Sequence, residues 1–192
     1  DGYLGSLGKS TRKDMRRKLR SPGPRVEWRS SIDDVLPDIM RLYEASLGRS
    51  DLQFERLPPA YFTGILQQLG DRALCVLYWL DDQLVAFNLL LIDEHRLVDK
   101  FFGHDLELTR EYSLYFRSWM ENVDYCIRNR IALYECGQAG YASKVRLGCT
   151  FQSNTLFFRH RNGLVNNMLK LVKLFVRPDR HDPALAAAIS EH

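Results

Sequence analysis

The sequence predicts an α+β domain in which helices flank a mixed, mostly antiparallel central sheet. Three strand-like runs, residues 73–80, 84–92 and 97–103, follow one another with only short polar breaks, which is typical of antiparallel hairpins. A helical pattern, a further strand, a short helix and a last strand come next, an order that adds a crossover to the hairpins. With 192 residues, 45% of them hydrophobic, the chain can bury one sizeable core but not two full domains.

The first helical pattern, residues 4–20, is strongly basic. It contains one acidic residue, Asp14, and seven basic residues: Lys9, Arg12, Lys13, Arg16, Arg17, Lys18 and Arg20. Residues 21–24, Ser-Pro-Gly-Pro, end this helix because proline lacks the N–H that a helix needs and restricts the residue before it. We therefore expect a basic helical arm over residues 1–21.

The remaining elements follow in order from hydrophobic periodicity. A short strand is expected near Val26 and Trp28, and a helix over 32–47, where apolar residues recur at helical spacing. After a loop at 48–57, two prolines open a helix that runs to about residue 69. Beyond the three strands, the pattern predicts a helix at 112–129, a strand at 131–136, a short helix within 137–148, a strand at 150–159 and a helix at 164–176. The main domain would then span residues 22–177, with a loose tail at 178–192.

Composition excludes several classes of protein. A net charge of +3 with 27% charged residues is too mild for a surface that binds polyanions throughout. The four cysteines are widely spaced, without a CxxC pair or a histidine at ligand spacing, which argues against a metal site and a disulfide framework. This cysteine usage suits a reducing compartment, so we expect a cytoplasmic protein. No apolar run is long enough for a membrane span. Because the chain starts at Asp1 within a helical pattern, we also expect a fragment whose preceding half completes the active site.

The segment at residues 134–148, YECGQAGYASKVRLG, carries the most chemical information. Gly137 and Gly140 can adopt positive φ and expose backbone N–H groups at the strand tip. Tyr141 and Lys144 are three residues apart on the next helix and so share a face. Tyr141 could protonate a leaving group, Lys144 could hold an anionic group, and Glu135 could accept a proton. Alternatively, Tyr141 packs under the helix, Lys144 is solvated, and Glu135 pairs with an arginine.

A second candidate group, Gly103-His104-Asp105, ends a strand before the long helix. His104 could act as a base near neutral pH, and Asp105 could cap the next helix or bind the acceptor. Tyr112 and Ser113 open the helix and could contact a donor, although serine is equally suited to capping. The alternative for His104 and Asp105 is an ordinary turn pair.

These motifs, together with residues 3–20, resemble the C-terminal half of the FemAB-like acyltransferases, which include a cellulose-biosynthesis group and have the GNAT fold. The resemblance implies transfer of an acyl group from acyl-CoA or aminoacyl-tRNA to an amine of a small molecule or cell-envelope precursor. It implies that strands 97–103 and 131–136 splay apart to admit the donor. On this basis the catalytic residues would be Tyr141, Glu135 and Asp105, and the binding residues Lys144, Gly137, Gln138, Gly140, His104 and Tyr112.

The sequence leaves alternatives open for both the acyl donor and the activity. Residues 103–111 contain several acids and one glycine, whereas acetyl-CoA enzymes of this fold have a glycine-rich loop that holds the pyrophosphate. The expected donor is acyl-CoA, but this loop argues against ordinary acetyl-CoA binding and keeps aminoacyl-tRNA as an alternative, whose phosphates the basic helix could contact. A rival hypothesis is a non-catalytic GNAT-like module that binds nucleic acid or a partner domain through that helix. A third is a purely structural half that supports the preceding one.

Overall fold

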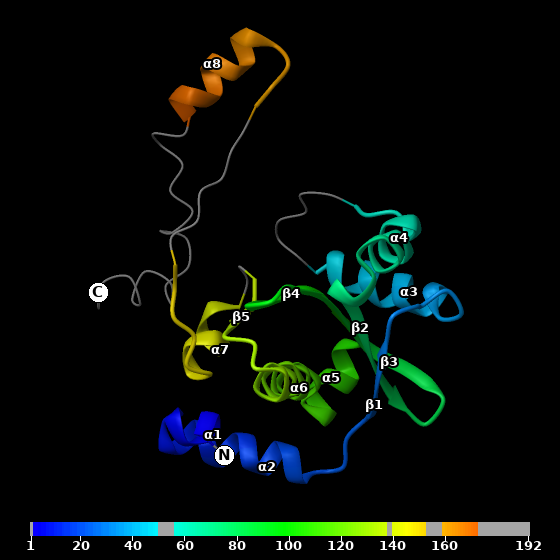
Figure 1. Ribbon diagram of the computed structural model, residues 1–192, viewed down its shortest axis with the longest axis vertical. Helices are drawn as coiled ribbons and strands as arrows, with labels where there is room; N and C mark the ends of the chain where they lie inside the picture. Colours follow the sequence, from blue (N-terminus) through cyan, green and yellow to red (C-terminus); the bar gives the residue numbers. More distant parts are fainter. Residues whose placement is uncertain (1, 50–55, 138–139, 153–158, 173–192) are drawn as a thin grey trace. The chain divides into compact units, whose positions relative to one another are not determined.

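The computed structural model describes residues 2–49, 56–137, 140–152 and 159–172 of the chain (Figure 1). The chain divides into two compact units, which are described separately below. The larger unit comprises residues 13–137, and the smaller comprises residues 1–12 and 138–192.

The larger unit is built on a five-stranded sheet with strand order β1-β2-β3-β4-β5. The first three strand pairs are antiparallel, and β4 and β5 are parallel, which confirms the predicted mixed, mostly antiparallel sheet. The strands are β1 (Arg25–Arg29), β2 (Ala73–Leu80), β3 (Gln83–Ile92), β4 (Arg96–His104) and β5 (Leu133–Glu135). The tight connections between β2, β3 and β4 follow from the short polar breaks that separate their apolar runs.

Helices cover both faces of this sheet, and each face has its own hydrophobic core (Figure 1). Helices α3 (Leu36–Leu47) and α4 (Pro59–Leu69) pack on one face, and α6 (Leu114–Asn129) packs on the other. Alternation along β2 feeds both cores: Cys75 and Leu77 point to the α3 and α4 side, whereas Val76 and Tyr78 point to the α6 side. The two-sided burial explains why β2 and β3 are almost continuously apolar.

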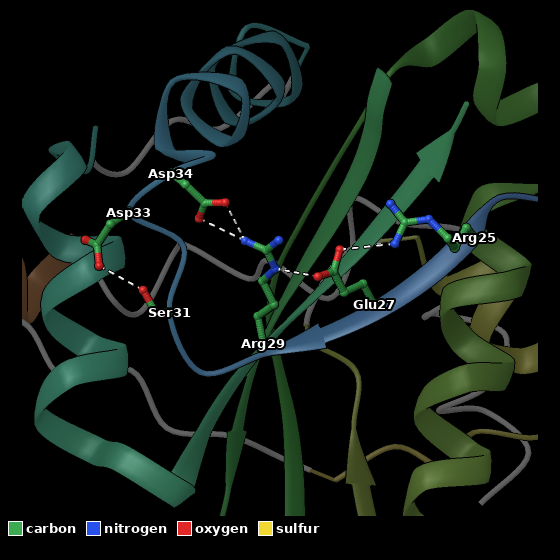
Figure 2. Close-up of polar contacts among 6 residues, drawn as sticks. All are labelled: Arg25, Glu27, Arg29, Ser31, Asp33 and Asp34. Atoms are coloured by element: carbon green, nitrogen blue, oxygen red, sulfur yellow. Dashed lines mark hydrogen bonds and ion pairs between the residues drawn. The ribbon is translucent and has the colours of Figure 1, made fainter. Parts of the chain in front are cut away.

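The edge strand β1 carries a row of charged side chains (Figure 2). The Glu27 carboxylate accepts hydrogen bonds from Arg25 at 3.3 Å and from Arg29 at 2.7 Å, and Arg29 also binds Asp34 at 2.7 Å. The hydrogen bond from Arg29 is the main reason that the pKa of Glu27 is lowered. Because such exposed pairs add little stability, the more important effect of these charges is to make the sheet edge unattractive to another strand.

Strands β4 and β5 part soon after they meet. Only three residues of each are paired, ending at Val98 opposite Glu135. Strand β4 then continues for six more residues, 99–104, while the chain after Glu135 leaves the sheet. The parting falls between the two strands that the sequence indicated, although β5 is shorter than predicted.

The basic helix α2 (Lys9–Arg20) is packed onto α6 through its second half, residues 13–20, which belongs to the larger unit. Met15 is fully buried, and the Lys18 ammonium lies 3.9 Å from the centre of the Phe116 ring. The Arg117 guanidinium on α6 donates to the backbone carbonyls of Lys18 at 2.7 Å, Ser21 at 2.6 Å and Pro22 at 3.1 Å. The arm at residues 1–21 stays a prediction as a separate segment, but these contacts fix the end of α2 to the domain.

The region between β4 and α6 differs from the sequence expectation. Residues expected to form a loop form helix α5 (Leu106–Tyr112), because Asp105 caps it by accepting hydrogen bonds from the N–H groups of Glu107 and Leu108. The predicted helix at 112–129 therefore starts later, at Leu114, after Ser113 has adopted a left-handed conformation with φ of 55°. Ser113 makes no capping hydrogen bond through its side chain.

The smaller unit contains α1 (Gly2–Ser6), the start of α2, α7 (Tyr141–Arg146) and α8 (Gly163–Val172). The Tyr3 hydroxyl donates to the carbonyl of Leu147 at 2.8 Å and so connects the N-terminal segment to the end of α7. The strand predicted at 150–159 falls largely on residues 153–158, outside the described residues, and residues 150–152 and 159 are not in a strand. The last residues of the predicted 164–176 helix and the 178–192 tail also lie outside the described part.

Candidate functional site

Four polar side chains form a closed hydrogen-bond ring where β4 and β5 part. Asp99 is the first residue of β4 after the three that pair with β5. Its carboxylate accepts from the Asn88 amide at 2.7 Å and from the Tyr134 hydroxyl at 3.0 Å. The Asn122 amide closes the ring by donating to the Asn88 carbonyl oxygen at 3.1 Å and to the Tyr134 hydroxyl oxygen at 2.9 Å.

The ring lies between the sheet and α6. Asn88 comes from β3, Asp99 from β4 and Tyr134 from β5, and Asn122 comes from the sheet-facing side of α6. The register places Leu90 beside Asp99, and Leu90 belongs to the core on the α6 side. Three strands and one helix thus each contribute one residue to the ring.

Burial strengthens the electrostatic interactions within this ring. Asn88 and Asn122 are completely buried, whereas Asp99 and Tyr134 keep partial exposure. Burial, followed by the Asp99 charge, raises the pKa of Tyr134 well above its usual value, so the phenol keeps its proton at neutral pH. In this environment a carboxylate that accepts two hydrogen bonds is held in one orientation and can accept a proton from an approaching group.

Two further buried polar atoms lie on the same side of the sheet. The Asn122 carbonyl oxygen and the Tyr78 hydroxyl have no hydrogen-bond partner among the residues that the structure describes. Burial is also the main cause of a raised pKa for Tyr78, to which the charges of Glu121 and Asp99 add. A buried acceptor or hydroxyl without a partner costs about 1–3 kcal/mol, and such groups concentrate at functional sites.

None of the four ring residues was among the predicted site residues, although two of them stand out in the sequence. Asn88 is a lone polar residue in the apolar run at 84–92, and Asp99 interrupts the run at 97–103. An isolated polar side chain in a buried strand needs a hydrogen-bond partner. The sequence does not show which residue that partner is. Asn122 was missed because a polar residue within a helical pattern is ordinarily expected on the exposed face of the helix.

Glu135 and Asp105, two of the predicted catalytic residues, are engaged in other interactions. Glu135 accepts a hydrogen bond from Arg96 at 3.2 Å, and its side chain is 42% exposed, as in the alternative in which it pairs with an arginine. One Asp105 oxygen is occupied by the backbone N–H groups of Glu107 at 3.0 Å and Leu108 at 3.2 Å. Their roles in catalysis stay predictions.

His104 ends β4 in a confined position. Its ring stacks on Phe102 with centroids 5.0 Å apart, and the Arg49 guanidinium donates to its backbone carbonyl at 3.2 Å. Burial, reinforced by the Arg49 charge, lowers the pKa of His104 to about 4. The imidazole is therefore uncharged at neutral pH and too weakly basic to be an efficient proton acceptor there. Its role in binding stays a prediction.

Tyr112 is the last residue of α5, where the negative charge of the neighbouring Glu111 is the main cause of its raised pKa. A phenol with a raised pKa remains protonated at neutral pH and can still donate a hydrogen bond. Contact of Tyr112 with a donor stays a prediction.

The glycines of the 134–148 segment have the expected backbone. Gly137, at the end of the larger unit, has a φ of 71°, and Gly140, in the smaller unit, has a φ of 70°. Both values lie in the left-handed region, where glycine is favoured because it lacks a Cβ. Gln138 lies outside the described residues.

Tyr141 and Lys144 lie in the first turn and a half of α7. The Tyr141 ring packs edge to face on Phe151 with centroids 5.6 Å apart, as in the packing alternative. Lys144 is only 5% exposed, so the alternative of a solvated lysine is wrong. A buried ammonium needs compensating polar or anionic contacts, and its roles in binding stay predictions.

No group of three or more His, Cys, Asp or Glu residues within the described part of the chain is arranged to hold a metal ion. In the same part, none of the helices has the length and apolar character that crossing a bilayer requires.

Comparisons with known proteins identify the family of the chain. Residues 9–144 match the family model described as "Acetyltransferase (GNAT) domain", so the chain belongs to the GNAT acetyltransferase family. A comparison with curated protein sequences finds no match.

Two solved structures illustrate the shared fold. A possible acetyltransferase from Clostridium difficile 630 is 16% identical with a TM-score of 0.50, over 70% of this chain and 99% of that one. The aminoglycoside antibiotic 6'-N-acetyltransferase AAC(6')-Ih from Acinetobacter baumannii is 12% identical with a TM-score of 0.51, over 73% of this chain and all of that one, 100%. At these identities the likeness extends to the fold alone.

Proposed function

We propose that the protein is an N-acyltransferase of the FemAB-like type that moves an acyl group from acyl-CoA to an amine of a small molecule or cell-envelope precursor. The observation that carries this proposal is the parting of β4 from β5 beside the Asp99 ring, within a domain of the GNAT family. A cytoplasmic location and a preceding half of the same protein as partner belong to the same proposal.

In the reaction that we propose, the nitrogen lone pair of the acceptor attacks the thioester carbonyl carbon. A C–N bond forms and the C–S bond breaks, with no acyl-enzyme intermediate. The proton lost by nitrogen passes to the Asp99 carboxylate, and the thiolate takes a proton as it leaves. The Asp99 carboxylate suits this role better than Glu135, because Glu135 is exposed and paired with Arg96.

The roles inferred from the resemblance remain part of this proposal. Tyr141 would protonate the leaving thiolate, and Lys144 would bind an anionic part of the donor or acceptor. Both residues lie in the smaller unit, whereas Asp99 lies in the larger one.

Acyl-CoA and aminoacyl-tRNA remain the two candidate donors. The N–H groups of Glu107 and Leu108 in the first turn of α5 donate to Asp105, so these two donors are already engaged and less suited to holding a phosphate. We nevertheless favour acyl-CoA, because the chain belongs to an acetyltransferase family.

Donor binding to the purified chain should raise its thermal unfolding temperature. At a concentration 100 times Kd, a bound acyl-CoA should add about 2.7 kcal/mol to the free energy of unfolding. The measurement is a thermal shift with a panel of acyl-CoA thioesters at fixed salt, with desulfo-CoA as control. A folded chain that shows no shift with any thioester would contradict the choice of acyl-CoA and favour aminoacyl-tRNA.

The exposed face of α2 favours a second candidate function, nucleic-acid binding. Lys13, Arg16, Arg17 and Arg20 are all exposed and, at a helical period of 3.6, lie on one side, away from buried Met15. Their only described acidic neighbour on the helix is Asp14, which binds Arg17 at 2.7 Å. Four cations on one helix face can contact successive phosphates.

Binding of a generic RNA should then weaken steeply with salt. Neutralising Arg16 and Arg17 together should flatten the slope of log K against log salt by about 1.4–1.8, because each phosphate contact contributes about 0.7–0.9. Fluorescence anisotropy at several salt concentrations measures this slope, and neutralising Arg128 and Arg130 provides a control. An equal slope in the wild type and the Arg16, Arg17 variant would exclude this function for α2.

A further inference from the structure

The hydrogen-bond ring has a single consistent direction. Asp99, when ionised, can only accept, so Asn88 must turn its NH₂ group toward it and its carbonyl oxygen away from it. That carbonyl oxygen accepts from the NH₂ group of Asn122. The same NH₂ group also donates to the Tyr134 oxygen, which leaves the phenol hydrogen free to point to Asp99.

We propose that Asn122 is a positioning residue that directs both hydrogen-bond donors of the ring, the Asn88 amide and the Tyr134 hydroxyl, onto the Asp99 carboxylate. This inference rests on the proposed function in taking Asp99 as the group that receives the proton of the acceptor amine. Its physical content is that one NH₂ group, by donating twice, fixes the orientation of two other side chains.

The reverse orientation of Asn122 shows why its direction matters. If its carbonyl oxygen occupied the place of the NH₂ group, it would face the Asn88 carbonyl oxygen and would attract the Tyr134 hydrogen away from Asp99. The observed orientation instead leaves the Asn122 carbonyl oxygen without a partner among the described residues. The fold accepts one unsatisfied buried acceptor, and the result is a carboxylate that receives two hydrogen bonds.

Packing holds the Tyr134 ring beside Asn122. Asn122 is fully buried, and the neighbouring Trp119, one turn earlier on α6, packs edge to face on the Tyr134 ring with centroids 5.0 Å apart. This contact holds the Tyr134 ring in place, so that only its hydroxyl hydrogen remains to be directed. Among the titratable groups in this region, Glu121 on α6, Asp99 on β4 and Cys75 on β2 act on Tyr78, and Asp99 and Cys136 act on Tyr134.

Asn122→Asp should change the protonation of Asp99. The variant replaces the donating NH₂ group by an acceptor and brings a second carboxylate into the ring, and both effects disfavour the ionised form of Asp99. We expect the Asp99 titration midpoint to rise by about one pH unit or more. The measurement is a ¹³C NMR titration of the aspartate carboxyl carbons in the full 192-residue chain, with the Asp99 signal assigned through Asp99→Asn.

The matched control is Asn129→Asp, the same change on the exposed surface of the same helix, which should leave the Asp99 midpoint unchanged. If Asn122→Asp does not fold, Tyr134→Phe provides the second test, since it removes one of the two donors and should raise the midpoint in the same direction. An Asp99 midpoint equal to that of the wild type in a folded Asn122→Asp or Tyr134→Phe chain overturns the inference.

This titration needs no substrate, so it separates the inference from the proposed function. A raised midpoint in a protein that transfers no acyl group would leave the positioning by Asn122 intact and remove the acyltransferase role. Acyl transfer together with an unchanged Asp99 midpoint would support the acyltransferase role and contradict the positioning by Asn122. In an active protein, the acid limb of the pH–rate profile should move with the NMR midpoint.

Discussion

Asp99→Asn should lower the rate of acyl transfer by about 10²–10⁴-fold, which is the usual contribution of a positioned proton acceptor. The side chain keeps its shape but loses the ability to take up a proton. Its amide would also compete with the donors of Asn88 and Tyr134 that now face the carboxylate at 2.7 and 3.0 Å. Release of free thiol from an acyl-CoA in the presence of a panel of amines measures the rate.

Folding has to be separated from catalysis in this experiment. The mismatched hydrogen bonds should reduce stability by about 1–3 kcal/mol, so the rate should be compared well below the unfolding midpoint of the variant. Asp124→Asn removes an exposed carboxylate on α6, which pairs with Arg128 at 2.6 Å, and should leave the rate unchanged. An Asp99→Asn chain that is folded and keeps the full rate would show that Asp99 is not the proton acceptor.

Phe62→Ala should produce the largest loss of stability, about 3–5 kcal/mol, because it opens a cavity in the core between the sheet and helices α3 and α4. Phe62 is fully buried on α4. Its ring meets those of Tyr43 at 5.0 Å, Phe101 at 5.9 Å and Phe87 at 6.1 Å between centroids. Urea denaturation followed by circular dichroism measures the change.

Phe62→Leu is the matched variant, since it keeps most of the apolar volume and should cost only about 1 kcal/mol. Typical domains are stable by about 5–15 kcal/mol, so the alanine variant should lose a large share of the total. A loss below about 1 kcal/mol for Phe62→Ala would mean that this ring cluster does not contribute to stability as its burial indicates.

Local sequence patterns were sufficient for the order of elements. Short polar breaks between apolar runs predicted the β2, β3 and β4 hairpins, and Pro58 and Pro59 correctly indicated the start of α4. Asp105 shows the limit of such patterns: capping was among its anticipated roles, but the helix that it caps was expected to be a loop. A seven-residue helix with one capping residue has too few periodic positions to be distinguished from a loop by pattern.

The candidate site was less predictable than the fold. Sequence reasoning selected residues at strand ends and glycine turns, such as Glu135 and Gly137, because these positions are recognisable one at a time. Glu135 proved to be paired with Arg96, 39 positions away in the chain. Partners at such separations depend on strand register, and register is set by the packing of the whole sheet.

The sequence by itself determined the fold class and the basic character of α2, because hydrophobic period, turn residues and charge are local properties. The tertiary structure alone decided that Asn88, Asp99, Asn122 and Tyr134 meet in one ring. Each of them is an ordinary polar residue in its own segment. They become a site because burial between the sheet and α6 brings them together, and buried polar groups need hydrogen-bond partners, with Asp99 as the acceptor to which Asn88 and Tyr134 donate.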